Sequence, residues 1–250
     1  MNIKWNKKDT YNFLKEYKEP KILFFDIEAS NLDADFGKTI CFGYKFKGQK
    51  YPNSISVLDD PNFLKNNKFN DFYVLKMCSE VFSKADVVCS WYGKRFDVPF
   101  LNTRLLFNKL PPLPPIIHID GWEIARYGLK FHSNRLESVS SFLNIDEKTK
   151  LRPEIWSDAI SGHKDSIKYI IEHCLQDVVV LEQAYEKIKP YSMRHPNLSI
   201  LFSKRGSCRV CGSKKLTFQG YRYTLHSKYR RMKCTNCYSW QQNSIENKVW

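Results

Sequence analysis

The sequence predicts an α/β domain with a mixed sheet, followed by a small metal-binding domain. Three observations lead to this prediction. Short apolar stretches typical of strands alternate with amphipathic helical stretches, one of the strands carries two carboxylates, and two C-x-x-C pairs lie near the C-terminus. The chain has 250 residues, of which 42% are hydrophobic and 15% aromatic, enough for one sizeable core and a smaller second unit.

The periodicity of apolar residues predicts the elements in order. The expected strands cover residues 21–30, 39–48, 54–60, 85–93 and 116–120, and the first three form an antiparallel meander. The expected helices cover residues 1–20, 72–85, 96–110, 135–145 and 164–188, with Ser133 or Asn134 capping the fourth. This order is typical of a mixed sheet with helices packed against it. The domain boundaries that follow are 1–189 for the α/β domain, 190–206 for a linker and 207–250 for the second domain.

The first expected strand, KILFFDIEAS, contains Asp26 and Glu28 within an otherwise apolar run. Side chains of a strand alternate with period two, so both acids project from the same face, about 7 Å apart. Burying two like charges together costs several kcal/mol unless a partner neutralises them, and a divalent cation does this well. The alternative is that both acids mark the exposed end of the strand.

Two further acids have unusual settings. Asp97 follows an aromatic residue where a buried strand gives way to a helix, an edge at which α/β proteins bind ligands. Asp177 lies in the middle of an apolar helix, one turn after His173, so the two share a helix face. Taken singly, each has a structural explanation as a helix cap or a surface pair. Asp120, at the end of the fifth strand, is expected to cap a turn and not to bind a ligand.

Together, FDIEAS, GKRFDVPFL and HCLQDVVVLEQAY resemble the three motifs of the DEDD 3′–5′ exonucleases, in their order and spacing over residues 21–189. The most similar branch is the exonuclease domain of family B DNA polymerases with its stand-alone relatives. The resemblance implies a ribonuclease-H-like fold and two-metal hydrolysis of phosphodiester bonds with two Mg²⁺ or Mn²⁺ ions. It further implies a nucleic-acid substrate, with DNA favoured over RNA and single-stranded 3′ ends favoured over structured ones.

The same resemblance implies roles for five residues. Asp26 would bridge the two ions, Glu28 and Asp177 would hold the ion that carries the nucleophilic water, and Asp97 would hold the other. His173 would orient or deprotonate that water. Two positions depart from the family pattern. The family has either Tyr four residues before the last Asp or His five residues before it, whereas this chain has His at the four-residue spacing, and Tyr92 stands where relatives often have Asn. A catalytically inactive nucleic-acid-binding or protein-docking module on this fold, and a structure-selective endonuclease, remain alternatives.

The charge of the chain is concentrated in its C-terminal part. Residues 190–250 hold twelve Lys or Arg and one acid, Glu246, a balance of +11, whereas the first 189 residues hold 28 basic and 25 acidic side chains. Such asymmetry indicates that the tail binds a polyanion, most often nucleic acid. The N-terminal 20 residues lack the apolar core of a signal peptide, and no apolar run is long enough to span a membrane. We therefore expect an intracellular protein, cytoplasmic or nucleoid-associated, without a membrane partner.

The eight cysteines fall into two groups. Four are scattered among apolar neighbours and are expected to be reduced core residues: Cys41, Cys78, Cys89 and Cys174. The other four form two C-x-x-C pairs, a spacing typical of one structural Zn²⁺ in a zinc ribbon: Cys208, Cys211, Cys234 and Cys237. A redox pair is the alternative. With roughly 40 residues this domain depends on metal binding for its folding.

Basic and aromatic residues alternate between the two cysteine pairs and predict a β-hairpin that contacts phosphates and stacks on bases. A protein-docking ribbon is the alternative. The candidate nucleic-acid-binding residues are Arg222, Tyr223, Lys228, Tyr229, Arg230, Arg231 and Lys233.

Overall fold

The computed structural model describes residues 20–66, 70–145, 153–201 and 206–244. The chain divides into two compact units. One consists of Lys21–Ile188, and the other of Met1–Pro20 together with Lys189–Trp250. The helix expected at residues 1–20 lies outside the described residues, apart from Pro20.

The first unit is built on a five-stranded mixed sheet. Its strands are β1 (Ile22–Ala29), β2 (Thr39–Phe46), β3 (Asn53–Ser56), β4 (Val87–Ser90) and β5 (Ile117–Asp120), in the spatial order β3-β2-β1-β4-β5. The strands β1, β2 and β3 pair antiparallel, whereas β4 pairs parallel with both β1 and β5. The mixed sheet and its antiparallel meander are therefore confirmed.

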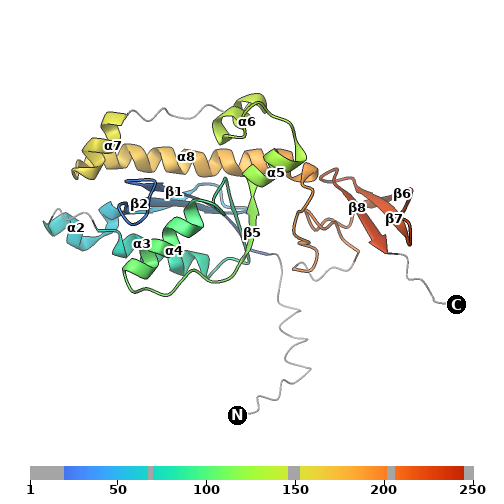
Figure 1. The fold of residues 1–250 in the computed structure, drawn as a ribbon, viewed down its shortest axis with the longest axis horizontal. Helices are drawn as coiled ribbons and strands as arrows, with labels where there is room; N and C mark the ends of the chain where they lie inside the picture. Colours follow the sequence, from blue (N-terminus) through green and yellow to red (C-terminus); the bar gives the residue numbers. More distant parts are fainter. Residues whose placement is uncertain (1–19, 67–69, 146–152, 202–205, 245–250) are drawn as a thin grey trace, which may run out of the picture. The chain divides into compact units, whose positions relative to one another are not determined.

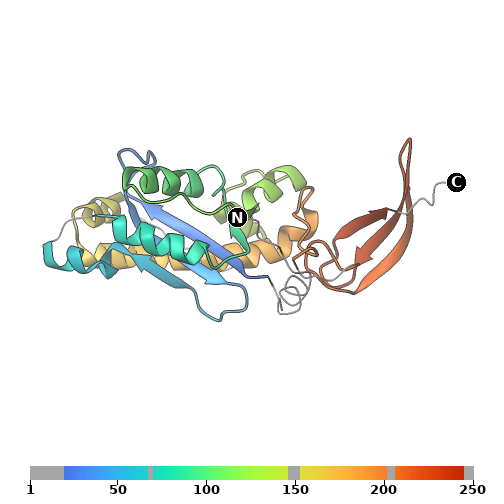
Figure 2. The ribbon, with the colours of Figure 1, turned by 90° about the horizontal axis from the view of Figure 1, so that it is seen from below.

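Helices cover both faces of this sheet. The long helix α8 (Lys164–Ile188) lies across one face, and α3 (Phe72–Phe82) and α4 (Asp97–Phe107) lie on the opposite face (Figures 1 and 2). On β1, the ring of Phe25 packs edge-on at 4.9 Å from that of Phe82 of α3, while Phe24 faces Tyr185 of α8 at 5.7 Å. Alternate residues of β1 thus face different helices, so this strand is covered on both faces.

Among the described residues, three α-helices were not expected from the sequence: α2 (Pro61–Asn66), α5 (Gly121–Gly128) and α7 (Pro153–Ile160). The strand expected at 54–60 is shorter than predicted, because a one-turn helix, η1 (Val57–Asp59), replaces its second half. A capping box explains the change, since the Leu58 amide donates to Ser56 Oγ and the Ser56 amide donates to Asp59 Oδ2. The side chain of Ser56 thus ends the strand.

The helix expected at 135–145 is α6 (Leu136–Phe142). Its N-cap is Arg135, so the prediction of Ser133 or Asn134 is wrong. Ser133 still contributes, because its hydroxyl accepts a hydrogen bond from the Arg135 amide at 3.3 Å.

The second unit contains a short helix, η2 (Lys189–Tyr191), and a three-stranded antiparallel sheet, β6 (Leu216–Tyr223), β7 (Lys228–Cys234) and β8 (Trp240–Ser244). The expected hairpin is formed by β6 and β7, and β8 adds a third strand that was not predicted. Between Phe218 and Tyr221 the register shifts by one residue, and Gly220 there has a φ of 83°. A glycine adopts this left-handed conformation without strain, as a β-bulge often requires.

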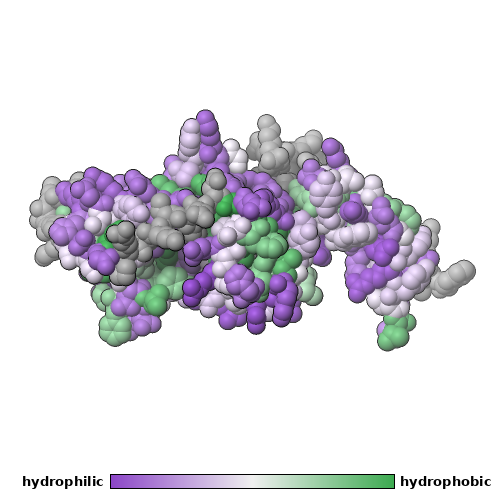
Figure 3. Space-filling model, turned by 90° about the horizontal axis from the view of Figure 1, so that it is seen from above, coloured by the Kyte–Doolittle hydropathy of each residue, from purple (hydrophilic) through white to green (hydrophobic). Residues whose placement is uncertain are grey.

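The surface seen from above is mostly hydrophilic, and its hydrophobic residues form separate patches (Figure 3). Within the described ranges, no helix is long and apolar enough to cross a bilayer.

Candidate functional site

The site begins at the face of β1 that is turned toward α8. That face is apolar at Phe24 and becomes acidic at Asp26 and Glu28, the next two residues with the same orientation. Opposite Asp26 lies Cys174 of α8, whose Sγ is 3.5 Å from the main-chain oxygen of Asp26 and 3.8 Å from its Oδ2. Because Phe24 meets Tyr185 whereas Asp26 meets Cys174, α8 runs antiparallel to β1 and its middle part reaches the two acids.

Glu28, His173 and Asp177 form a compact cluster at this position. His173 Nε2 lies 3.9 Å from Glu28 Oε1 and 3.8 Å from Asp177 Oδ2. One nitrogen or oxygen atom of each residue lies within 4.8 Å of those of the other two. All three side chains are largely buried, at 12–14% exposure. The structure thus brings together one acid from β1 and the helical pair that share a face of α8.

Asp97 reaches the same strand from the other side. It is the first residue of α4, is 3% exposed, and accepts a hydrogen bond through Oδ1 from the amide of Ile27 at 3.2 Å. Ile27 stands between Asp26 and Glu28, so three distant segments meet at this end of β1. Burial raises the pKa of Asp97 from 3.8 to about 7, although the backbone hydrogen bonds, including that from Ile27, oppose the rise.

The loop that carries Asp97 is held by Asp120. Its carboxylate accepts hydrogen bonds from the amides of Tyr92 at 2.8 Å and Lys94 at 3.1 Å, and it also caps α5. The expectation that Asp120 is a cap is confirmed, but its hydrogen bonds with the loop amides were not predicted. Tyr92 has a φ of 68°, a left-handed conformation that Asn tolerates better than Tyr. A Cβ on the adjacent Gly93 would lie 2.3 Å from Ser90 Oγ, so this loop has no room for a side chain there.

Gly43 is a second residue that sequence reasoning missed. It lies directly opposite Asp26 on β2, and a Cβ built there would lie 2.8 Å from Cys174 Sγ and 3.2 Å from the main-chain oxygen of Cys174. The absence of a side chain therefore lets α8 approach the sheet next to the acids. A glycine inside a strand often marks such a close approach, which was the available signal.

The donor set of this site fits hard divalent cations. Carboxylate oxygens, which Mg²⁺ and Mn²⁺ prefer, come from β1, α4 and α8. The raised pKa of Asp97 also favours a cation site, because a nearby positive charge stabilises the ionised form of a buried carboxylate. Asp26, Glu28, Asp97 and Asp177 are the residues that could hold such ions.

The second unit contains a four-cysteine cluster. The ligand sulfurs all lie within 4.8 Å of one another, with Cys208 and Cys237 at 3.6 Å and Cys211 and Cys234 at 3.8 Å. A tetrahedral zinc with bonds of about 2.3 Å has sulfurs about 3.8 Å apart, so the spacing fits the metal. The amides of Val210 and Asn236 point at the sulfurs of Cys208 and Cys234, each at 3.4 Å. The cluster is compatible with the expected zinc ribbon.

All four remaining cysteines, Cys41, Cys78, Cys89 and Cys174, are buried and reduced, as predicted.

The candidate nucleic-acid-binding residues divide between the two faces of the ribbon sheet, because paired residues of adjacent strands share a face. Arg222, Tyr229, Arg231 and Lys233 share one face with Trp240. Tyr223, Lys228 and Arg230 lie on the other. On the first face, the Arg231 guanidinium and the Lys233 amine lie over the Trp240 ring at 5.3 and 5.9 Å. On the second, the Lys228 amine lies over Tyr221 at 3.9 Å.

Comparison with known proteins supports this description of the fold. The family model of the RNase_H superfamily matches residues 23–189. Among solved structures, the family B DNA polymerase of the hyperthermophilic archaeon Pyrobaculum calidifontis matches with a TM-score of 0.56 and 15% identity. The match covers 85% of this chain but only 32% of the polymerase chain. No curated protein sequence matches significantly.

Proposed function

We propose that this chain, which belongs to the RNase_H superfamily, is a metal-dependent 3′–5′ exonuclease that hydrolyses phosphodiester bonds of nucleic acid, with single-stranded DNA ends favoured. One observation carries the proposal: Glu28, His173 and Asp177 place their ligand atoms within 4.8 Å of one another. Asp97 accepts a hydrogen bond from the amide of Ile27, the residue between Asp26 and Glu28 at the same end of β1. Asp97 and Asp26 are therefore the fourth and fifth side chains of the candidate site. A nuclease is the function of this superfamily that such a cluster of acids serves best.

Each residue has a part in this chemistry. Asp26, Glu28, Asp97 and Asp177 would hold two Mg²⁺ or Mn²⁺ ions. Bound there, the ions would supply an activated water and stabilise charge on the attacking and leaving oxygens. His173 accepts the proton of the water as general base or orients it, a role suited to an imidazole held between two carboxylates.

The neighbours of the acids keep this geometry fixed. Asp120 holds the loop that precedes Asp97, Gly43 lets α8 lie close to β1, and Cys174 fills the space behind Asp26. Positioning of this kind matters because a displacement of about 1 Å can cost a catalyst on the order of 100-fold in rate.

The ribbon of residues 207–250, held by one Zn²⁺, binds the nucleic acid. Residues 206–244 contain no acidic residue, and their Lys and Arg side chains are interleaved with exposed tyrosines. Phosphate contacts from such residues give affinity without sequence preference. We assign residues 1–189 to the nuclease domain and 190–206 to the linker.

The decisive experiment is digestion of a single strand by the full chain with Mg²⁺ or Mn²⁺, using a 5′ label to display the products and a 3′ label to follow release of the first nucleotide. An exonuclease of the proposed polarity gives a ladder that shortens one nucleotide at a time and releases the 3′ label early. Asp26→Ala and Asp177→Asn should each abolish the ladder while strand binding survives. Cleavage at the wild-type rate in both variants would refute the proposal.

The same assay, run on single-stranded and on branched substrates, separates the two other functions that this fold could serve. An inactive binding module leaves the strand intact with every metal, and a structure-selective endonuclease yields internal fragments from branched substrates in place of the ladder.

A further inference from the structure

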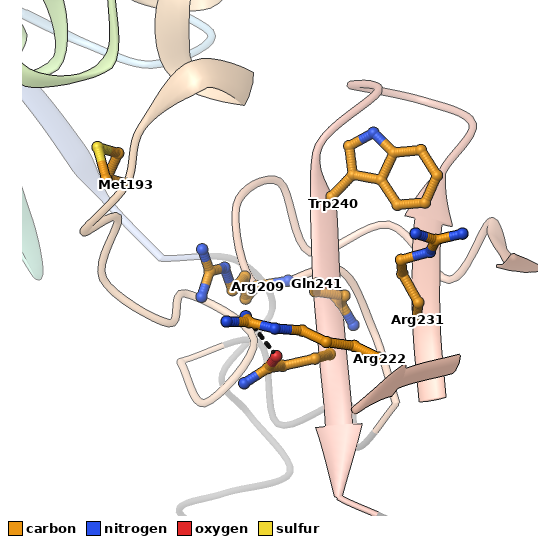
Figure 4. A pocket seen from close by; sticks show the side chains of 7 residues that line it. Met193, Arg209, Arg222, Arg231, Trp240 and Gln241 are labelled. Atoms are coloured by element: carbon orange, nitrogen blue, oxygen red, sulfur yellow. Dashed lines mark hydrogen bonds between the residues drawn. The ribbon is translucent and has the colours of Figure 1, made fainter. Parts of the chain in front are cut away.

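The ribbon contains a pocket of about 370 Å³ lined by three arginines (Figure 4). Arg209 follows the first zinc-site cysteine, Arg222 extends from β6 and Arg231 from β7. Trp240 lies at one side of the pocket beside Arg231, and Arg209 and Arg222 reach the pocket from different segments (Figure 4).

The hydrogen bonds of these arginines leave much of their donor capacity available. Arg222 Nη1 donates to Gln242 Oε1 at 2.9 Å, and Arg231 Nε donates to the main-chain oxygen of Gln219 at 3.0 Å. Arg209 Nε is buried, and within the described part of the chain it donates to no acceptor. A guanidinium has five N–H donors, and a buried donor without an acceptor destabilises the folded state.

The charge of the pocket also requires a partner. Several guanidinium groups that line one small pocket repel one another, and residues 206–244 include no carboxylate that could compensate. An anion between the arginines would accept hydrogen bonds from the remaining N–H groups and would also offset the repulsion between the guanidinium charges.

We propose that this pocket binds one phosphate group of a nucleic-acid strand. The proposal rests on the proposed function, because it locates within the ribbon the place where the strand is held. Three arginines match a phosphate better than lysines would, because each planar fork can donate two parallel hydrogen bonds to its oxygens. Arg231 is oriented in advance by its contact with the Trp240 ring, and the neutral Gln241 and Gln242 add no repulsion toward an anion.

The test compares variants of Arg222, whose side chain forms a hydrogen bond with Gln242 at the surface of the sheet. Arg222→Lys keeps the charge but loses the forked geometry, and Arg222→Gln loses both. Lys214→Gln removes one charge from an exposed ribbon residue outside the pocket and serves as the matched control. Binding of a labelled single-stranded 12-mer to the full zinc-loaded chain is measured over a range of NaCl concentrations without added Mg²⁺ or Mn²⁺. Zinc content verifies that each ribbon is folded.

We expect Arg222→Lys and Arg222→Gln to weaken binding by about fivefold or more, and Lys214→Gln by less than about twofold. Arg222→Gln removes a positive charge, so it should lower by about one the slope of the logarithm of the binding constant against the logarithm of the salt concentration. Arg222→Lys keeps the charge and should leave this slope unchanged. Inorganic phosphate at constant ionic strength should compete with the strand for the wild-type protein and not for Arg222→Gln.

The pocket is refuted if Arg222→Lys binds like the wild type, or if Arg222→Gln loses no more than Lys214→Gln. Diffuse attraction by the net charge of the ribbon then explains binding. Digestion of the labelled strand distinguishes this result from failure of the proposed function. A wild-type chain that digests the strand while the Arg222 variants bind normally refutes the pocket alone. A chain that binds through the pocket but never digests refutes the nuclease alone.

Discussion

His173 Nε2 on α8 lies 3.9 Å from Oε1 of Glu28 on β1, two residues that are far apart in the sequence. The same nitrogen lies 3.8 Å from Asp177 Oδ2. An imidazole at the four-residue spacing therefore faces the acids and does not point away from them. This position belongs to Tyr in one branch of the exonucleases that the chain resembles, so both side chains can be compared directly.

Replacing His173 by Ala should lower the cleavage rate by about 10²–10⁴-fold, the usual contribution of a general base, and should change KM much less. The four carboxylates proposed to bind the metal ions remain, so metal binding should survive. His173→Tyr should retain more activity than His173→Ala, because a tyrosine hydroxyl can still orient the water. Single-turnover rates with Mn²⁺ test both statements. A His173→Ala rate within about threefold of the wild type would exclude the base role.

Asp97→Asn should stabilise the protein in the absence of Mg²⁺ and Mn²⁺, and the gain should grow with pH. Burial raises the pKa of Asp97 from 3.8 to about 7. Between these values the folded wild type binds more protons than the unfolded chain, so its stability falls as the pH rises, whereas Asn does not titrate. The gain is absent below pH 3.8, complete above pH 7, and amounts to at most about 4 kcal/mol.

Urea unfolding of both proteins at pH 5 and pH 8 measures this difference, which should be larger at pH 8 by up to about 3 kcal/mol. The Asn side chain can still accept the hydrogen bond of the Ile27 amide, so the comparison isolates the charge. Added Mn²⁺ should stabilise the wild type more than Asp97→Asn. If the difference in unfolding free energy between the two proteins did not change with pH, folding would not raise the pKa of Asp97.

Local periodicity was sufficient to predict the orientation of the acids. The period of two on β1 places Asp26 and Glu28 on one face, and the helical period places His173 and Asp177 on one face of α8, as the structure has them. The positions of these faces relative to each other depend on Gly43 and Cys174, residues whose importance arises from tertiary contact. The glycine within a strand was the one local signal, at Gly43, and no local pattern distinguishes Cys174 from an ordinary core cysteine.

The elements that were missed have weak local signals. Helix α5 has only eight residues and both begins and ends with glycine, a poor helix former. Strand β8, WQQNS, is mostly polar and lacks the alternation of a half-buried strand. The hydrogen bond that the Arg209 amide donates to Gln241 Oε1 helps to hold this strand. The arginine pocket could not be predicted from local patterns, because Arg209 and Arg222 line one pocket only after the ribbon has folded.

Cys234→Ser should remove zinc from the ribbon and unfold it, while the Lys21–Ile188 unit remains folded. The four cysteine sulfurs are the ligands of the proposed zinc site. Binding of structural zinc typically contributes about 10–16 kcal/mol to the folding free energy of a domain of this kind. Zinc content should fall from one ion per chain to none, and binding of long single strands should weaken strongly. Cleavage of a dinucleotide, which has few phosphates for the ribbon to bind, should persist. A variant that retains one zinc per chain would contradict the assignment of the site.

Gly43→Ala should disturb the active site through α8. The new methyl group would lie 2.8 Å from Cys174 Sγ and 3.2 Å from the Cys174 main-chain oxygen, so the helix must shift away from β2. Overpacking of this kind costs about 1–3 kcal/mol. The same shift moves Asp177 relative to Asp26, so cleavage should fall further than the loss of folded protein explains.

Adding Cys174→Ala to Gly43→Ala tests this cause. The second change removes the nearer of the two contacts, so the double variant should recover part of both stability and activity, although the main-chain oxygen at 3.2 Å remains close. Cys174→Ala alone serves as the control and should destabilise the protein modestly, because a buried sulfur is lost. A double-mutant cycle should give a coupling energy within the range of about 0.5–3 kcal/mol that is typical of residues in contact. Strictly additive effects would show that Gly43 is needed for the conformation of β2 and not for the approach of α8 to the acids.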